Sequence, residues 1–257
     1  MIKLIMTYMK KTLVLPVLVV MISVLGFSAQ NAMALTSTVH DKISCEAPSV
    51  GGAWNSITST CTVATLVIGP TDKLVVASNV IFNIGTVTSS GSIVNKGTIN
   101  IASGGVITTS GAFSNQGAIV SSGTITNSGP FKNYGILGSS GTITNGPTGV
   151  ISSSGSITSS GVITSSGAMQ INSTGILVNN GGTLTNTLNI VNKGTMVTSG
   201  TFTNSGPVMN TGNIINQGLL TNSNTITNSG QIFNLCGGSI TNSGTISGHT
   251  VKFICVA

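Results

Sequence analysis

The chain has 257 residues, of which only 5% are charged, and it contains 34 glycines, one Trp and no Arg. This composition is unlike that of an ordinary globular enzyme. It does not predict disorder either, because 40% of the residues are apolar and they recur at a regular spacing, so the low charge does not prevent folding.

Residues 1–34 have the pattern of a signal peptide. Three lysines precede the apolar run of residues 12–29, and the sequence Ala-Met-Ala at 32–34 supplies the small residues that a signal peptidase requires. We therefore expect a mature chain that begins near Leu35. An uncleaved anchor is the alternative, since the apolar run approaches the length that spans a membrane.

Residues 35–80 are expected to form an N-terminal cap. They precede the regular repeat and hold Trp54 and a loop between Cys45 and Cys61. An open end of a stack of strands is an unpaired sheet edge that would pair with other chains. A segment that covers this edge is therefore expected.

Residues 81–248 are expected to form a β-solenoid. From Gly85 onward the sequence divides into 26 consecutive units of mostly six residues, such as GTITNSG at 123–129, and the third residue of every unit is apolar. Because side chains alternate across a strand, an inward third residue implies outward second and fourth residues. All but two units begin with Gly, which we place at a corner where a positive φ costs little. The fifth residue, usually Asn or Ser, then faces inward, where stacked amides form ladders.

Three units make up one coil. When every third unit is grouped, one group has Thr at the fourth position in all nine units, whereas each of the other two groups has it once. The sequence therefore predicts an all-β, single-stranded parallel β-solenoid with triangular coils of about 18 residues. Either handedness is compatible with this pattern.

The three outward faces of such a solenoid differ in chemistry. Face A, the face with the threonine column, is the candidate binding face, whereas face B, the next along the chain, is mixed. Face C, the third, becomes apolar toward the C-terminus, and an exposed stripe of this kind usually marks a contact. The candidate binding residues of face A are Thr86, Thr88, Thr108, Thr124, Thr126, Thr142, Thr144, Thr164, Thr183, Thr185, Thr201, Thr203, Thr221 and Thr241, and the apolar stripe of face C consists of Val178, Val197, Ile215 and Phe233.

The tail, residues 249–257, is expected to cap the other end. Nine rungs at about 4.8 Å each would separate the two ends by about 40 Å, whereas a disulfide needs Cα atoms within about 7 Å. Cys45 with Cys61 and Cys236 with Cys255 is therefore the expected pairing, and it suits an exported protein. We expect either this tail or a second molecule to cover the apolar stripe.

Groups suited to catalysis are scarce. Between residues 73 and 257 there is no Asp, Glu or Arg, and His40 and His249 lie at opposite ends of the solenoid region. Polysaccharide-cleaving solenoids need carboxylates, and a Ser without a neighbouring base is inert, so we predict a non-enzyme without metal or cofactor. Three isolated lysines, Lys96, Lys132 and Lys193, are interpreted as surface residues that favour solubility. The sequence has no basic cluster with aromatic residues, so it does not indicate a nucleic acid partner. No contact with a membrane is expected after signal cleavage.

The segment CEAPSVGGAWNSITSTCTVATLVIGPTDKLVV, followed by repeats such as GTITNSG, resembles exported archaeal and bacterial surface proteins with parallel β-helical repeats. These include the passenger regions of adhesins and autotransporters. The resemblance covers nearly all of the expected mature chain and implies a role in cell-surface structure, adhesion or biofilm matrix. The chain is short for a large adhesin.

Two functions follow from these observations. The first is a secreted or cell-surface structural or adhesive module, whose faces contact glycans, other cells or copies of itself. The second is an ice-binding protein, because the Thr-x-Thr positions of face A form a grid with spacings of about 6.7 Å along the strand and about 4.8 Å between rungs. The grid is broken at Val106, Val162, Leu219 and Ser239, which favours the surface module.

Overall fold

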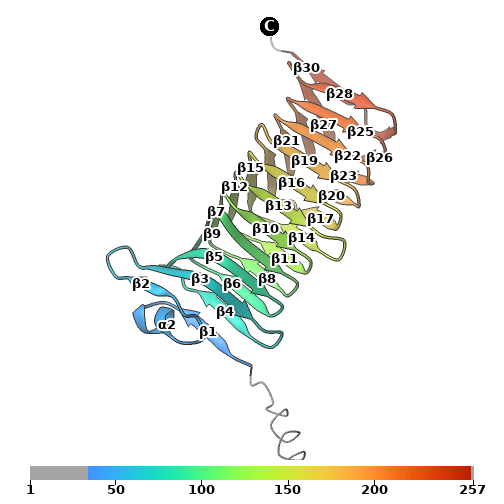
Figure 1. Ribbon diagram of the computed structural model, residues 1–257. Helices are drawn as coiled ribbons and strands as arrows, with labels where there is room; N and C mark the ends of the chain where they lie inside the picture. Colours follow the sequence, from blue (N-terminus) through green and yellow to red (C-terminus); the bar gives the residue numbers. More distant parts are fainter. Residues whose placement is uncertain (1–33, 256–257) are drawn as a thin grey trace, which may run out of the picture. The chain divides into compact units, whose positions relative to one another are not determined.

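The computed structural model describes residues 34–255, and the expected signal peptide lies outside these residues except for Ala34. Residues 35–255 form a parallel β-solenoid in which strands from β1 to β30 stack along one axis (Figure 1). The predicted fold class is therefore confirmed. Strand-sized pieces of three or four residues separated by tight corners produce this fold, because each coil buries its apolar residues only against the coils on either side.

Face B is a sheet of 11 parallel strands. Each strand pairs with the strand one coil later, and the register keeps equivalent residues side by side, as with Phe131 and Ile151. Its strands are β1 (Thr36–Val39), β4 (Lys73–Val76), β6 (Ser92–Asn95), β8 (Phe113–Asn115), β11 (Pro130–Asn133), β14 (Val150–Ser153), β17 (Ala168–Ile171), β20 (Ile190–Asn192), β23 (Val208–Asn210), β26 (Thr225–Asn228) and β29 (Thr245–Gly248).

Faces A and C belong to one sheet of 19 strands. They are joined because the three strands of the first coils, β3 (Thr60–Ile68), β5 (Ile81–Ser89) and β7 (Thr98–Thr109), run through face C and continue into face A. Face A continues with β10 (Thr124–Asn127), β13 (Thr142–Asn145), β16 (Val162–Ser165), β19 (Thr183–Asn186), β22 (Thr201–Asn204), β25 (Leu219–Asn222) and β28 (Ser239–Asn242). Face C continues with β9 (Ala118–Ser121), β12 (Ile136–Ser139), β15 (Ser156–Ser159), β18 (Ile176–Asn179), β21 (Thr195–Thr198), β24 (Asn213–Asn216), β27 (Gln231–Leu235) and β30 (Val251–Ile254).

The interior is built from the third residue of each repeat unit. These side chains are buried from Val87 to Ile232, and only those of the last two units, Ile240 and Ile246, are partly exposed. The difference has a simple cause, since the last coil has a neighbouring coil on only one side. The predicted core column is confirmed.

The fifth residues form the expected amide ladders inside the corners. Asn186 donates through Nδ2 to Oδ1 of Asn204 at 2.8 Å, and Asn204 donates in the same way to Asn222 at 2.7 Å. All ladder donors point toward the C-terminus, so the Oδ1 of the first Asn of a ladder accepts no bond from another ladder amide; it is buried without a partner except at Asn127, where it accepts from the backbone NH of Gly129. Five such buried amide oxygens occur within residues 34–255, and each belongs to the first residue of a ladder: Asn95, Asn179, Asn186, Asn192 and Asn216.

The leading glycines at the corners are required for a different reason from the one expected. Positive φ occurs not at the leading glycines but at inserted ones just before them, such as Gly104 (φ 82°) and Gly181 (φ 78°). At a leading position such as Gly141, an added Cβ would overlap the carbonyl oxygen of Gly123 in the previous coil. The repeat therefore needs glycine for close backbone approach between coils, and the prediction of positive φ was wrong.

The N-terminal segment contributes rungs of the solenoid and a further disulfide-closed part, whose role as a cap stays a prediction. β1, β3 and β4 are already solenoid strands, because β1 pairs with β4 and β3 pairs with β5. The remaining part contains helix α2 (Lys42–Glu46) and β2 (Ala53–Asn55), which pairs antiparallel with β3. Asp41 caps α2 by accepting a hydrogen bond from the Ser44 backbone NH. The hydrogen bonds that Asp41 accepts from the backbone and the side chain of Ser44 lower the pKa of its carboxyl. The expected disulfide between Cys45 and Cys61 closes this segment, with Cα atoms 5.7 Å apart.

The tail ends the solenoid as a further rung. Strand β30 pairs parallel with β27 on face C, and the second expected disulfide joins Cys236 to Cys255. Because Lys252 stands beside Phe233 in this register, the tail extends the column of face C and does not lie across it. Of the two expected covers of the apolar stripe, the tail was therefore wrong, whereas a second molecule stays a prediction.

Candidate functional site on the long faces

The threonine column of face A is continuous in space. Register pairs connect Thr88 to Thr108, Thr108 to Thr126, and onward through every rung to Thr221 and Thr241. The second and fourth residues of all nine units on this face are exposed or partly exposed, and in every unit but the last they alternate with buried side chains. The predicted side chains therefore lie together on one outward surface.

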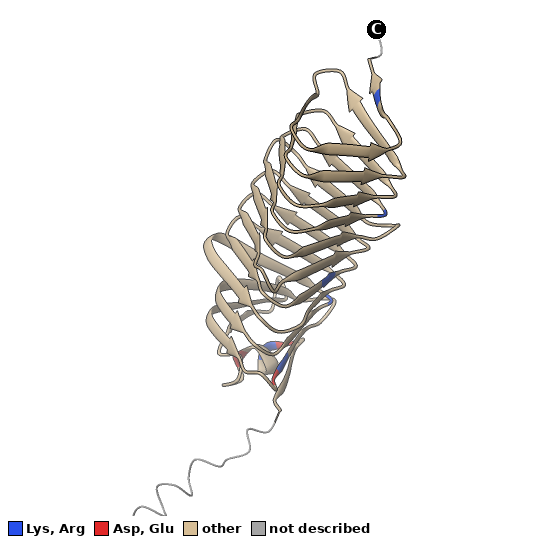
Figure 2. Cartoon of the chain, turned by 90° about the vertical axis from the view of Figure 1, so that its right-hand side faces the viewer, with Lys and Arg blue, Asp and Glu red and all other residues tan. Residues whose placement is uncertain are grey.

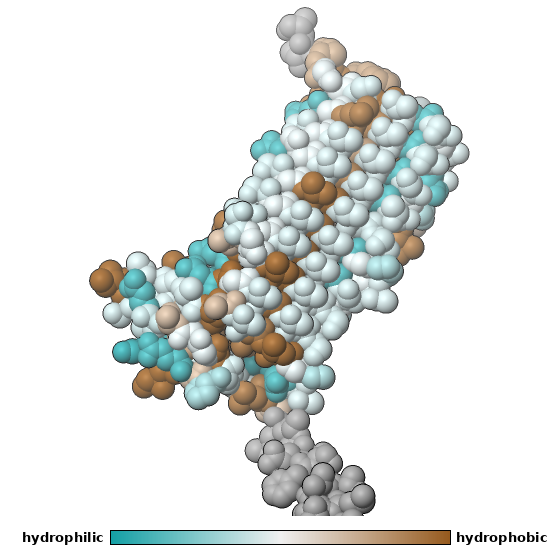
Figure 3. Space-filling model, in the orientation of Figure 1, coloured by the Kyte–Doolittle hydropathy of each residue, from teal (hydrophilic) through white to brown (hydrophobic). Residues whose placement is uncertain are grey.

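The second column of this face is less regular. Thr124 and Thr142 are neighbours, as are Thr183 and Thr201, but valine flanks the first pair at both ends. No run of Thr-x-Thr rungs within residues 34–255 is therefore longer than two. In Figure 3 the visible side of the solenoid is mostly pale, near the middle of the hydropathy scale, with a few apolar positions in brown.

The apolar stripe of face C is also continuous. Val178, Val197, Ile215 and Phe233 are successive register partners, and all four side chains are half-buried. The ammonium of Lys252 lies 5.7 Å from the centre of the Phe233 ring, so a cation ends the stripe. Apolar exposure on this face also extends further toward the N-terminus than expected, through Ile136 to Val120.

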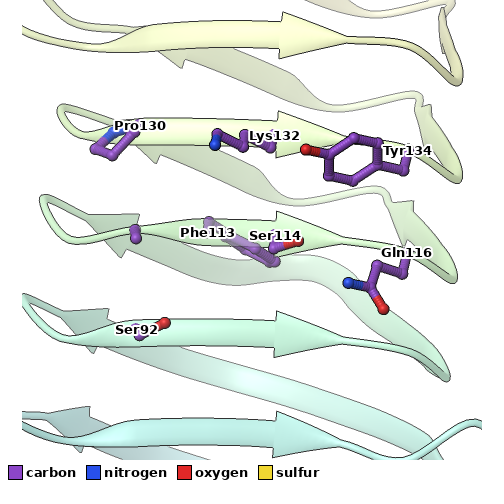
Figure 4. A pocket seen from close by; sticks show the side chains of 8 residues that line it. Ser92, Phe113, Ser114, Gln116, Pro130, Lys132 and Tyr134 are labelled. Carbon is purple, nitrogen blue, oxygen red and sulfur yellow. The ribbon is translucent and has the colours of Figure 1, made fainter.

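Face B carries a shallow depression of about 690 Å³ near the corner that leads to face C (Figure 4). Pro130, Lys132 and Tyr134 come from β11 and the turn after it, and the neighbouring rung supplies small side chains. The depression is lined by Ser92, Ala112, Phe113, Ser114, Gln116, Pro130, Lys132 and Tyr134. The sequence pattern predicts that Lys132 lies on the surface but indicates no site there.

The charged groups have structural roles or stand alone. Carboxylates gather near the N-terminal end, as Figure 2 shows. Asp72 accepts hydrogen bonds from the backbone NH groups of Leu35 and Gly69, and Asp41 is the helix cap. Among residues 34–255 no three His, Cys, Asp or Glu side chains gather in a group that would hold a metal ion. The described part of the chain likewise has no helix with the length and apolar character to cross a membrane.

A parallel solenoid with uncharged, repetitive faces belongs to the class of structural β-helical proteins. The family model described as haemagglutinin repeat matches residues 63–129, 132–230 and 181–250, and the chain belongs to this family. The match begins within β3 and ends just before β30. No curated protein and no solved structure shows significant similarity to the chain. The family and the fold, with two disulfides, indicate an adhesin-like structural protein of the cell exterior.

The repeat pattern predicts the columns but not the depression. Columns follow from the repeat, because equivalent residues in successive coils must stack. The depression depends on a local sequence of unlike side chains over two rungs, which no periodicity predicts. One signal was present: Tyr134 is the one aromatic residue at the sixth position of a repeat unit, which places it at an outward corner.

Proposed function

We propose that this protein is a non-enzymatic adhesive or structural rod of the cell exterior, secreted or held at the surface, that contacts glycans, cells or copies of itself mainly through face A. The observation that carries this proposal is the column of nine threonines in unbroken register. Such a face offers repeated hydroxyl groups and methyl groups without charge. A contact spread over many rungs gains strength from repetition even where each rung binds weakly.

The proposal is tested by blocking the middle of face A. Thr142→Tyr combined with Thr144→Tyr adds bulk on the outward side and leaves the buried Ile143 untouched. We expect beads coated with this variant to lose most of their adhesion to the producing cells and to each other. The matched control is Ser156→Tyr with Thr158→Tyr, at equivalent outward positions of face C. Equal adhesion by both variants and the unmodified protein would remove face A as the contact surface.

Ice binding is the second candidate, and the same column favours it. Aligned threonines about 4.8 Å apart form a flat, repetitive array. The short Thr-x-Thr runs count against a lattice match over many rungs. Thermal hysteresis and the shape of ice crystals at high protein concentration distinguish the two candidates. Hysteresis that is lost in the double Tyr variant would support ice binding, whereas its absence from the unmodified protein would leave the adhesive rod.

A further inference from the structure

The depression on face B has a shape set by side-chain size. Small side chains, Ala112 and Ser114, stand on one rung, whereas Pro130 and Lys132 stand beside them on the next. Beneath the small pair lies the buried ring of Phe113, whose centre is 4.8 Å from that of Phe131. Phe113, packed against Phe131, gives the depression an apolar floor, and the longer side chains form a rim above it.

An aromatic side chain forms one wall of this depression. Tyr134 is 55% exposed, and Figure 4 shows its ring beside Lys132, with Gln116 on the rung below, in the turn after β8. Its backbone NH donates to the Asn115 carbonyl, which fixes the start of the side chain while leaving the ring outward. An exposed, rigid aromatic face beside polar groups is typical of a binding surface.

The polar groups of the rim have no partner in the protein. Side-chain hydrogen bonds in this part of the chain belong to the buried Asn115 and Asn133, and within residues 34–255 none uses the side chains of Lys132, Gln116 or Tyr134. Lys132 also has no ion-pair partner: the one ion pair within residues 34–255 joins His40 to Asp41, and the three acids of the sequence all precede residue 73. Lys96 follows the register partner of Asn115 and so adds a second positive charge next to Gln116. The depression therefore combines a ring, an amide and unneutralised positive charge.

We propose that this depression binds one acidic sugar residue, a pyranose ring that carries a carboxylate. The ring stacks on Tyr134, the carboxylate approaches the ammonium of Lys132, and Gln116 and Ser114 hydrogen-bond hydroxyl groups. A flat ring with an apolar face and a polar edge suits this arrangement better than an acidic peptide, whose flexible side chain would leave Tyr134 unused. The inference rests on the proposed adhesive function and gives it a ligand class, at a surface separate from face A.

Binding is measured by NMR on the full chain with ring-labelled tyrosine, whose ring resonances are followed. The sequence has two tyrosines, and Tyr134→Phe assigns the signal of Tyr134. We expect trigalacturonate to shift this signal in a saturable way, and added salt to weaken the effect because the charges are exposed. The neutral methyl ester of the same trimer should bind about three- to fivefold more weakly, the range for an exposed ion pair.

Variants separate the roles of the two groups. Lys132→Gln should remove most of the preference for the acid over its ester, and Tyr134→Ala should abolish binding of both, as followed by isothermal titration. Lys193→Gln is the matched control, because Lys193 is an exposed lysine of a later face B unit, at the corner position that Tyr134 occupies in its own unit. Identical thermal unfolding curves by circular dichroism show that the variants are folded.

Several results would overturn this inference. The first is the absence of any shift of the Tyr134 signal at about 10 mM trimer, a concentration at which even a millimolar Kd would be evident. The second is equal affinity of the unmodified protein for the acid and its ester. The others are equal effects of Lys132→Gln and Lys193→Gln on binding, and binding of tetraglutamate as tight as that of the trimer. The adhesion assay on face A is scored separately. If the unmodified protein binds no sugar and adhesion survives Tyr134→Ala, the sugar site alone is refuted. If the unmodified protein binds the sugar but does not adhere, the proposed adhesive function is refuted.

Discussion

The repetitive coils and the predicted N-terminal cap, which is here the part that holds α2 and β2 and is closed by the disulfide between Cys45 and Cys61, are stabilised in different ways. In the coils, a side chain packs mainly against its counterparts one coil before and after, as Ile143 does between Ile125 and Ile163. In the cap, each stabilising contact occurs only once: one disulfide, one capping aspartate, and Trp54 packed against the core. Stability in the coils is therefore a sum over neighbours, whereas the cap depends on a few groups that have no substitute.

The largest expected effect comes from a charge in the core column. Ile143→Asp places a carboxylate at a position that is 2% exposed and should lower the free energy of unfolding by about 4 kcal/mol. Ile143→Val, which keeps the position apolar, should cost about 1 kcal/mol. Urea unfolding followed by far-UV circular dichroism measures both. Similar midpoints for the two variants would contradict the assignment of the core column.

The cap is tested by removing its disulfide. Cys45→Ser with Cys61→Ser opens a 16-residue separation and should destabilise the cap by about 3 kcal/mol. Trp54 is the single Trp of the chain, so its fluorescence reports on the cap while circular dichroism reports on the coils. We expect the Trp54 transition to move to lower urea and separate from that of the coils. Coincident transitions would show that the cap and the coils unfold as one unit.

The close approach between coils is tested at a corner. Gly141→Ala adds a Cβ that overlaps the Gly123 carbonyl oxygen and should cost about 2 kcal/mol, as overpacking does. Gly138→Ala is a matched control only three residues away, because its nearest atom, the Ile119 carbonyl oxygen, is 3.9 Å from the added Cβ. Its unfolding midpoint should stay within error of that of the unmodified protein. Equal losses from the two alanines would point to strand propensity instead of backbone contact.

The smallest effect should be a gain. Asn145 donates to the hydroxyl of Ser165 at 3.1 Å, and one coil later the Oδ1 of Asn186 is buried without a partner. Ser165→Asn would join the two ladders into one and should stabilise the solenoid by about 1 kcal/mol. Ser165→Ala, which removes the acceptor, should be destabilising. A loss of stability in both variants, measured by urea unfolding, would contradict the ladder interpretation.

The sequence alone determined the coil length, the inward and outward columns, the threonine face and both disulfides. It did so because a solenoid places residues about 18 positions apart in contact, so that periodicity along the chain becomes contact in space. Only the tertiary structure decided why the leading glycines are required, since the overlap at Gly141 involves the previous coil. It also decided that β30 continues face C, and that Lys132, Tyr134 and Gln116 surround one depression. These features depend on the size and direction of particular side chains on neighbouring rungs, and a repeat pattern averages over both.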